Sequence, residues 1–284
     1  MSLERIRMIK EKDILKVWDA EQEILDVIHA VCVNNNLRYS LAYGTLLGGV
    51  RHAGFIPWDD DIDLIMPRED YEKFLNVWDK EAPKGYILQN GRTDTDFTQT
   101  FTKIRKDHTT FIQSDEEKDK KYHKGIFVDI FPGDRVAPGK ITNKIQYVLC
   151  AVFLLYSRGF TSGSGGLIGL IERILLKIPK EIQLYCRERL EKMIGYWNDN
   201  KDCKYFFPNT IEECCDYFDS DIFDEITDIH FRNKKYHTVK DKDKMLQQCY
   251  GNYMELPPKE ERVWRHHPIV IDFEKNYEEL KENS

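Results

Sequence analysis

The segment Asp59-Asp60-Asp61-Ile62-Asp63 places four carboxylates close together, between the apolar residues 55–58 and 64–66. Like charges at this spacing repel one another unless cations or solvent screen them. The run leads into an apolar segment, which is not typical of a solvated acidic turn. Asp61 and Asp63 are two residues apart, so on a strand both carboxylates point to the same face. This pattern predicts a site for a hard cation, Mg²⁺ or Mn²⁺.

A further carboxylate, Asp129, lies in the middle of the apolar segment GIFVDIF, residues 125–131. A lone aspartate is costly to bury without a partner or a metal. If the two segments are strands that share a face, Asp61, Asp63 and Asp129 form a metal-binding cluster suited to phosphoryl transfer. We take these three as the candidate catalytic residues, with Asp129 as a metal ligand or as the base toward an acceptor hydroxyl.

Candidate phosphate-binding residues surround the acidic run in the sequence. Tyr43-Gly44-Thr45 is a strand–Gly–Thr junction that opens a helix, and N–H groups at such a terminus point toward anions. Arg51 and His52 follow that helix and could hold a diphosphate, because a guanidinium binds phosphate oxygens in a fork. The alternative for this pair is an ordinary surface loop.

Basic residues further along the chain are weaker candidates. Lys103 and Arg105 alternate with apolar or neutral residues, so both point one way, either into a cleft or onto the solvated face of an edge strand. Arg262, His266 and His267 belong to a C-terminal segment that could reach the phosphates or the acceptor. Their alternative is a structural role, which is commoner for a histidine.

The elements that position these residues follow from hydrophobic periodicity. Apolar residues at helical spacing predict a helix over 13–33, and a second helix starts after Pro67. Alternation and short apolar runs predict strands at 37–43, 62–66, 86–90, 98–105, 109–113 and 125–131, with a short helix after Gly44. Helices mixed with strands in this way predict an α+β or mixed α/β core.

The middle of the chain has a different character. Between residues 135 and 192 there are ten Lys and Arg against four Glu, together with the apolar run Tyr147–Tyr156 and a helix-period stripe over 167–178. These features predict a mainly helical segment over 135–246. It either packs on the core or rests on an anionic bilayer or polymer through a basic amphipathic surface. We divide the chain into a catalytic core at 1–134, this segment, and a C-terminal part at 247–284 that returns to the active site.

Composition limits the partners. The 284 residues include 42 Lys and Arg against 49 Asp and Glu, a net charge of −7, so we expect no nucleic-acid partner. The charged N-terminus lacks the apolar core of a signal peptide, and the seven cysteines form no C-x-x-C pair. We therefore expect a cytoplasmic protein with reduced thiols, or one that is peripheral on the cytoplasmic face of a membrane.

Three segments resemble motifs of a known family. YSLAYGTLLGGVRHAGFIPWDDDIDLIMPREDYEKF, GIFVDIFPGD and YGNYMELPPKEERVWRHH are similar to those of the LicD family, which includes the fukutin-related transferases. The resemblance implies a nucleotidyltransferase-like fold: a mixed sheet with flanking helices, and a glycine turn and acidic residues around a metal. Gly44 and Thr45 match the turn, Asp61 and Asp63 the paired carboxylates and Asp129 the third, while Asp59 looks like an additional metal ligand. The turn is Gly-Thr instead of the Gly-Gly or Gly-Ser of the wider superfamily.

The resemblance also implies an activity. It is metal-dependent transfer of phosphocholine, or a related alcohol phosphate, from CDP-choline or another CDP-alcohol. The acceptor is a sugar hydroxyl of a cell-surface glycan, teichoic acid, lipopolysaccharide or lipid-linked sugar. Two alternatives use the same fold: a nucleotidyltransferase that moves NMP from an NTP to a small acceptor, and an inactive binding module.

Overall fold

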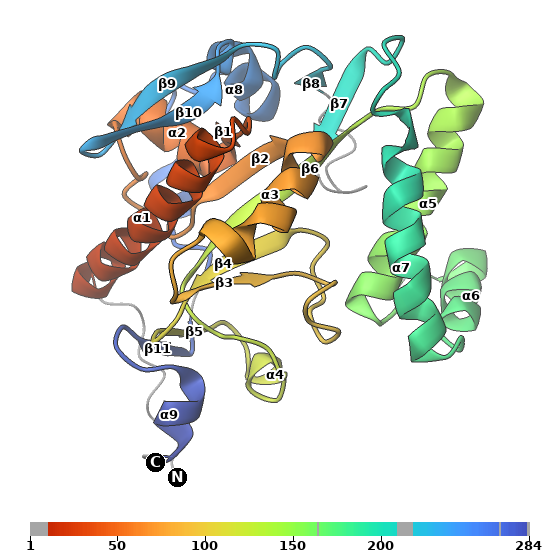
Figure 1. Ribbon diagram of the computed structural model, residues 1–284, viewed down its shortest axis with the longest axis horizontal. Coiled ribbons are helices and arrows are strands. Elements are labelled where there is room, and N and C mark those ends of the chain that lie inside the picture. The colour runs from red at the N-terminus through yellow and green to blue at the C-terminus, as the bar shows by residue number, and fades with distance from the viewer. Residues whose placement is uncertain (1–10, 164, 209–217, 267, 283–284) are drawn as a thin grey trace.

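The computed structural model describes residues 11–163, 165–208, 218–266 and 268–282 (Figure 1). A mixed β-sheet forms its centre, with strand order β1-β2-β6-β4-β3 and with β7 and β8 continuing from β6. The strands of this sheet are β1 (Ser40–Leu41), β2 (Asp63–Pro67), β3 (Tyr86–Gln89), β4 (Thr102–Lys106), β6 (Phe127–Arg135), β7 (Tyr205–Pro208) and β8 (Phe218–Asp219). The β2–β6 pair is parallel and the other pairs are antiparallel. The predicted mixed α/β fold is therefore confirmed.

Two helices cover one face of the sheet. α1 (Glu11–Asn34) and α3 (Arg68–Glu81) lie side by side in front of it in Figure 1. α1 buries Ile24, Leu25 and Ile28 completely, as its periodicity predicts. α3 starts directly after Pro67, whose fixed φ and missing N–H suit the first turn of a helix. The core of the protein lies between these helices and the sheet.

A group of three helices stands beside the sheet, at the right of Figure 1. It consists of α5 (Lys140–Arg158), α6 (Gly166–Leu175) and α7 (Lys180–Ile194), and a 3₁₀ turn, η1 (Gly195–Trp197), follows α7. A small second core holds α5 and α7 to the ends of β6 and β7; its buried members are Val136, Cys150, Phe153, Ile194 and Phe207. Within the described residues, no helix is long and apolar enough to cross a membrane.

The second half of the segment 135–246 differs from the sequence expectation. Instead of helices it contains β7, β8 and a hairpin of β9 (Ile226–Phe231) and β10 (Lys234–Val239), before α8 (Lys242–Tyr250). β10 carries Lys234 and Lys235 at its exposed end, so it shows no apolar run that would reveal a strand. The helical prediction is thus correct for 140–194 and wrong for the strands.

The C-terminal part contributes to a separate two-stranded sheet. β11 (Val270–Asp272) pairs with β5 (Thr110–Ile112), and α9 (Tyr277–Glu282) follows. The short elements α4 (Asp115–Lys118) and η2 (Lys259–Glu261) lie in the intervening loops. The segments predicted at 98–105 and 109–113 are joined by a turn, but β4 and β5 do not pair, because β5 takes β11 as its partner. Residues 98–101 are also not part of a strand.

Candidate active site

Two parallel strands bring the predicted carboxylates together. Asp63 of β2 is the register partner of Asp129 of β6, and Asp129 is in turn opposite Lys103 of β4. Tyr71 of α3 contacts Thr102 of β4 through their hydroxyl groups, 2.5 Å apart. Since neighbouring residues on a strand point to opposite faces, the row Asp63–Asp129–Lys103 lies on the face turned away from α3.

Lys103 neutralises Asp129. Its Nζ donates hydrogen bonds to both carboxylate oxygens, at 2.7 and 2.8 Å, and both side chains are buried. Nζ also lies 3.3 Å from the centre of the Phe127 ring, where a cation is attracted to the π-face. Burial lowers the pKa of Lys103, and the charge of Asp129 opposes this effect. Lys103 therefore points into the site, and not onto the solvated face of an edge strand, which was the other interpretation of its sequence.

The side chain of Asp59 packs against Gly44, in the first turn of α2 (Tyr43–His52). A Cβ built on Gly44 would lie 2.3 Å from Asp59 Oδ2, so only glycine allows this approach. A hydrogen bond from α1 fixes the loop that contains Asp59: the indole N–H of Trp18 donates to the Asp59 carbonyl at 2.8 Å. Burial and the neighbouring Asp61 raise the pKa of Asp59 to about 8. Gly44 thus accommodates a carboxylate at the position where the sequence predicted a phosphate contact.

The pKa values of Asp61 and Asp63 are raised as well. Burial raises the pKa of Asp61, and Asp129 adds to the shift. Burial also raises the pKa of Asp63 well above its usual range, with further contributions from Asp61 and Asp129. A dense set of partly exposed carboxylate oxygens with raised pKa values is the chemistry that suits a hard cation such as Mg²⁺.

His266 joins the C-terminal segment to the acidic loop. Its backbone N–H donates to Asp60 Oδ2 at 3.1 Å, and its Nδ1 lies 3.2 Å from Asp60 Oδ1 and 3.6 Å from Asp61 Oδ2. Burial disfavours the charged ring, but the bond to Asp60 and the charge of Asp61 prevail and raise the pKa of His266. Among the described residues, Asp60, Asp61 and His266 also form a group whose possible ligand atoms all lie within 4.8 Å of one another.

Several predicted phosphate-binding residues have protein partners. The Thr45 hydroxyl accepts a hydrogen bond from the N–H of Asp63 at 2.9 Å, so it joins the start of α2 to the start of β2. Arg51 donates to the carbonyls of Tyr253 and Glu255, and to the ring of His52. These bonds give Thr45 and Arg51 structural roles.

Arg105 and Arg262 are also engaged by neutral groups. Arg105 is buried and donates to Gln89 Oε1 at 2.5 Å and to the Gly125 carbonyl at 2.7 Å. It points to the same face as Lys103, but among the described residues it makes no hydrogen bond to a carboxylate of the cluster. Arg262 donates to the Pro257 carbonyl and lies over the Trp58 ring, 5.2 Å from its centre. His267 lies outside the described residues.

Three residues near the cluster were not among the site residues predicted from the sequence. Glu21 of α1 is 2% exposed, its Oε2 has no hydrogen-bond partner among the described atoms, and burial together with Asp61 raises its pKa. The charge of Arg265 opposes part of the rise in the pKa of Asp59. Asp60 is fully enclosed by the His266 segment. A signal existed for Glu21, because it lies four residues from both Val17 and Leu25 in the buried stripe of its helix.

Comparison with known proteins places this site in a family. The family described as "LicD/FKTN/FKRP, nucleotidyltransferase domain" matches residues 36–148, which include Gly44, Asp61, Asp63 and Asp129. The chain is also 30% identical to the lipopolysaccharide cholinephosphotransferase LicD of Haemophilus influenzae, over 86% of this chain and 92% of that protein. The chain belongs to the LicD family.

Two further proteins match the chain over a shorter stretch. An uncharacterized protein of Rickettsia typhi is 31% identical over 44% of this chain and 37% of its own length. A second, from Rickettsia prowazekii, is 30% identical over 38% of this chain and 41% of its own length. The match to the Haemophilus protein extends well beyond residues 36–148, because it covers 86% of the chain.

Proposed function

We propose that this protein transfers phosphocholine, or a closely related alcohol phosphate, from CDP-choline or another CDP-alcohol to a sugar hydroxyl of lipopolysaccharide or a similar surface glycan. The proposal depends on one observation, the similarity to the Haemophilus cholinephosphotransferase across 86% of the chain. The acidic row on β2 and β6 supports it, because phosphoryl transfer needs charge stabilisation beside the leaving group.

We propose Mg²⁺ or Mn²⁺ as the cofactor. The candidate ligands are carboxylates, which suit a hard cation. Glu21 adds a buried carboxylate whose Oε2 has no hydrogen-bond partner among the described atoms and whose pKa is raised by burial and by the nearby acidic residues. Asp59, Asp61 and Asp63 would hold it, with Asp129 completing the set. When bound, such an ion stabilises the negative charge that develops on the phosphate oxygens.

The chain's own residues divide the remaining tasks. The sugar oxygen forms a bond to the phosphorus that carries the choline, the bond from that phosphorus to the bridging oxygen breaks, and CMP leaves. The hydroxyl proton passes to a carboxylate of the acidic run. Both carboxylate oxygens of Asp129 already accept hydrogen bonds from Lys103, so neither is free to receive the hydroxyl proton. We therefore assign Asp129 to cation binding and Lys103 to its orientation.

Calorimetry and product analysis test this proposal. CDP-choline, CDP-ribitol, CDP-glycerol and CTP are titrated into the protein with Mg²⁺, and again with EDTA. Metal-dependent binding that prefers CDP-choline, with CMP released in the presence of acceptor, is the expected result. Release of pyrophosphate from CTP would favour the nucleotidyltransferase instead, and the absence of binding to all four would favour an inactive module.

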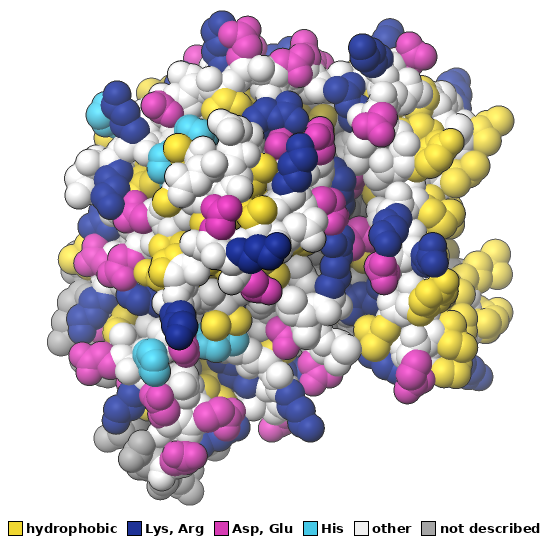
Figure 2. Space-filling view, viewed as in Figure 1, with side chains coloured by type: hydrophobic (Ala, Val, Ile, Leu, Met, Phe, Trp, Pro, Cys, Tyr) yellow, Lys and Arg dark blue, Asp and Glu magenta, His cyan; other side chains and the backbone are white. Residues whose placement is uncertain are grey.

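We also propose that the protein works at the cytoplasmic face of a membrane, where a cytosolic CDP-linked donor can meet a lipid-linked acceptor. The support is an apolar surface on the three-helix group, visible as the yellow side chains at the right of Figure 2. Its members are large apolar residues between 46% and 77% exposed, namely Ile141, Ile145, Val148, Phe160, Leu167, Ile168, Leu170, Ile171 and Ile174. Lys140, Lys144, Arg173 and Lys177 accompany them in the sequence, which complements an anionic lipid surface.

A further inference from the structure

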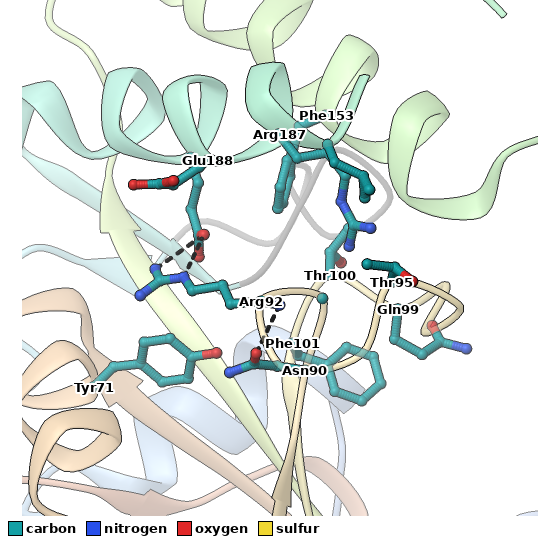
Figure 3. Close-up of a pocket in the computed structure, with 13 residues that line it drawn as sticks. Tyr71, Asn90, Arg92, Thr95, Gln99, Thr100, Phe101, Phe153, Arg187 and Glu188 are labelled. Carbon is teal, nitrogen blue, oxygen red and sulfur yellow. Dashed lines mark hydrogen bonds and ion pairs between the residues drawn. The ribbon is translucent and has the colours of Figure 1, made fainter. Parts of the chain in front are cut away.

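A cavity of about 240 Å³ lies between the sheet and α7, away from the acidic run. The loop that connects β3 to β4 forms its floor, with Asn90, Gly91, Gln99 and Thr100, and α5 and α7 form its roof (Figure 3). This volume is just below the range of roughly 300–1,000 Å³ found for small-molecule sites. Lys and Arg side chains follow the furrow between the main body and the helical group in Figure 2.

Arg187 is the unusual group in this cavity. It projects from α7 toward the loop, with Thr100 below its guanidinium in Figure 3. The residue is only 5% exposed, yet its Nη1 has no hydrogen-bond partner among the described residues. A buried charge is costly unless it is paired and hydrogen-bonded, so this guanidinium lacks the partner that its environment requires.

The carboxylates nearby have other partners. Glu191 bonds to Arg68 at 2.8 Å and to Arg92 at 2.9 Å. Glu188 bonds to Lys192 at 2.7 Å and points away from Arg187 in Figure 3. Burial and the charge of Arg187 both lower the pKa of Lys180, the first residue of α7, so a second positive charge lies close to Arg187. The free donor therefore faces a cavity in which an anion would be attracted.

The backbone of the floor is adapted to this arginine. A Cβ built on Gly91 would lie 1.8 Å from Arg187 Nη2, so a larger residue at position 91 would displace the guanidinium. We infer that the cavity is an oxyanion site, in which Arg187 binds a phosphate group that is either free or carried by a sugar. A guanidinium suits this ligand because its N–H groups match the oxygens of a phosphate in a fork.

Direct binding to the intact protein tests the inference without any assay of transfer. Inorganic phosphate, glucose 6-phosphate and glucose are titrated by calorimetry at constant ionic strength. Arg187→Gln should weaken phosphate binding about tenfold or more, since charge-assisted bonds to the anion are lost. Arg189→Gln is the matched control, because Arg189 is exposed on the same helix and loses the same charge. It should stay within about twofold of the unmodified protein, as expected for a screened surface charge.

A second variant separates binding from folding. Gly91→Ala removes no charge but places a methyl group against the guanidinium, so it should also weaken phosphate binding. Glucose 6-phosphate binding more tightly than phosphate would identify a phosphorylated sugar as the ligand, and equal affinities would identify the free ion. The inference is overturned if the unmodified protein binds neither anion, or if Arg187→Gln and Gly91→Ala both bind phosphate as the unmodified protein does.

Discussion

Asp63 and Asp129 are register partners on two parallel strands. A substitution in this pair tests whether the acidic residues are needed for transfer activity. We expect Asp63→Asn to reduce phosphocholine transfer on the order of 10³-fold, because a charge that stabilises the transition state is lost. The variant should unfold at the same or a higher temperature, since burial and its neighbours oppose the charge of Asp63 in the folded state. Asp79→Asn, an exposed position on α3, is the control. Full transfer activity in Asp63→Asn would remove this residue from the site.

Glu21 gives a separate prediction at the same scale. Its carboxylate is buried without a partner for Oε2, so Glu21→Gln should leave the stability unchanged or raise it, by up to about 2 kcal/mol. The same change removes an oxygen from the field of the acidic run and should weaken Mg²⁺ binding, roughly 10–100-fold as for other outer groups of metal sites. Chemical denaturation and metal titration measure the two effects. Glu23→Gln on the exposed side of α1 serves as the control, and unchanged metal affinity in Glu21→Gln would contradict the assignment.

The sequence predicted the role of a residue where the spacing of its neighbours determines which way its side chain points. The apolar segments around Asp63 and Asp129 were enough to predict two strands with these carboxylates on one face, because side chains on a strand have a period of two. Asp61, which was expected on the same strand, lies in the loop before β2. Arg51 and Arg105 could not be assigned in this way, since their partners come from residues 253–255 and from Gln89 and Gly125. Arg187 could not be singled out either, because the carboxylates near it in the fold bind other basic residues, and no local sequence pattern shows this.

At the scale of elements, one arginine connects the sheet, α3 and the helical group. Arg68 of α3 bonds to Asp134 of β6 at 2.6 Å and to Glu191 of α7 at 2.8 Å, and Asp134 is fully buried. Arg68→Ala should therefore lower the free energy of unfolding by about 3–5 kcal/mol, because it leaves the fully buried carboxylate of Asp134 without its charged partner. Lys73→Ala on the same helix breaks only an exposed pair with Glu69 and should cost less than about 1 kcal/mol. Equal losses in urea denaturation would contradict this role of Arg68.

The contact between α1 and the β9–β10 hairpin should depend on pH. His29 and His237 pack edge to face, with Tyr39 bonded to His29 and with Asp26 and Asp228 nearby; burial lowers the pKa of both histidines. A lowered pKa in the folded state means that the unfolded chain binds more protons. Stability is then complete above pH about 6.5 and falls as the pH drops below that value.

Denaturation midpoints at pH 7.5 and 5.5 measure this effect. His237→Gln should reduce the difference between the two midpoints, whereas His230→Gln, exposed on β9, should leave it unchanged. A difference that is the same in all three proteins would show that other groups cause it.

Elements with strong internal periodicity were predictable, and those defined by their partners were not. α1, α3 and β2 carry enough apolar residues in phase to be recognised alone. β10 is recognisable only beside β1, because Ser40 Oγ accepts the N–H of Val239 and its hydroxyl lies 3.2 Å from that of Thr238. β5 pairs with a strand more than 150 residues away instead of with its neighbour in sequence.

At the scale of the whole molecule, the acidic site and the apolar surface belong to different parts of the protein. The acidic residues lie on the sheet, whereas the exposed apolar residues lie on α5 and α6 or in the loop between them. α6 buries little of itself, since Leu167 is 72% exposed and Ile171 is 46% exposed. Its sequence alone left two interpretations open, packing on the core or contact with a membrane. The exposure favours the second for α6, because apolar surface that the chain leaves uncovered marks a contact site.

Vesicle sedimentation tests that surface. The protein should bind vesicles that contain phosphatidylglycerol, bind neutral vesicles less well, and dissociate at high salt, because basic residues contribute through screened attraction. Leu167→Asp combined with Ile171→Asp should weaken binding tenfold or more, given about 1.5–3 kcal/mol for each buried side chain of this size. The matched control is Leu15→Asp combined with Val33→Asp, which places the same two charges on exposed apolar positions of α1. Since both double variants change the net charge equally, a loss confined to α6 would identify the apolar contact itself, and an equal loss in both would leave only non-specific charge attraction.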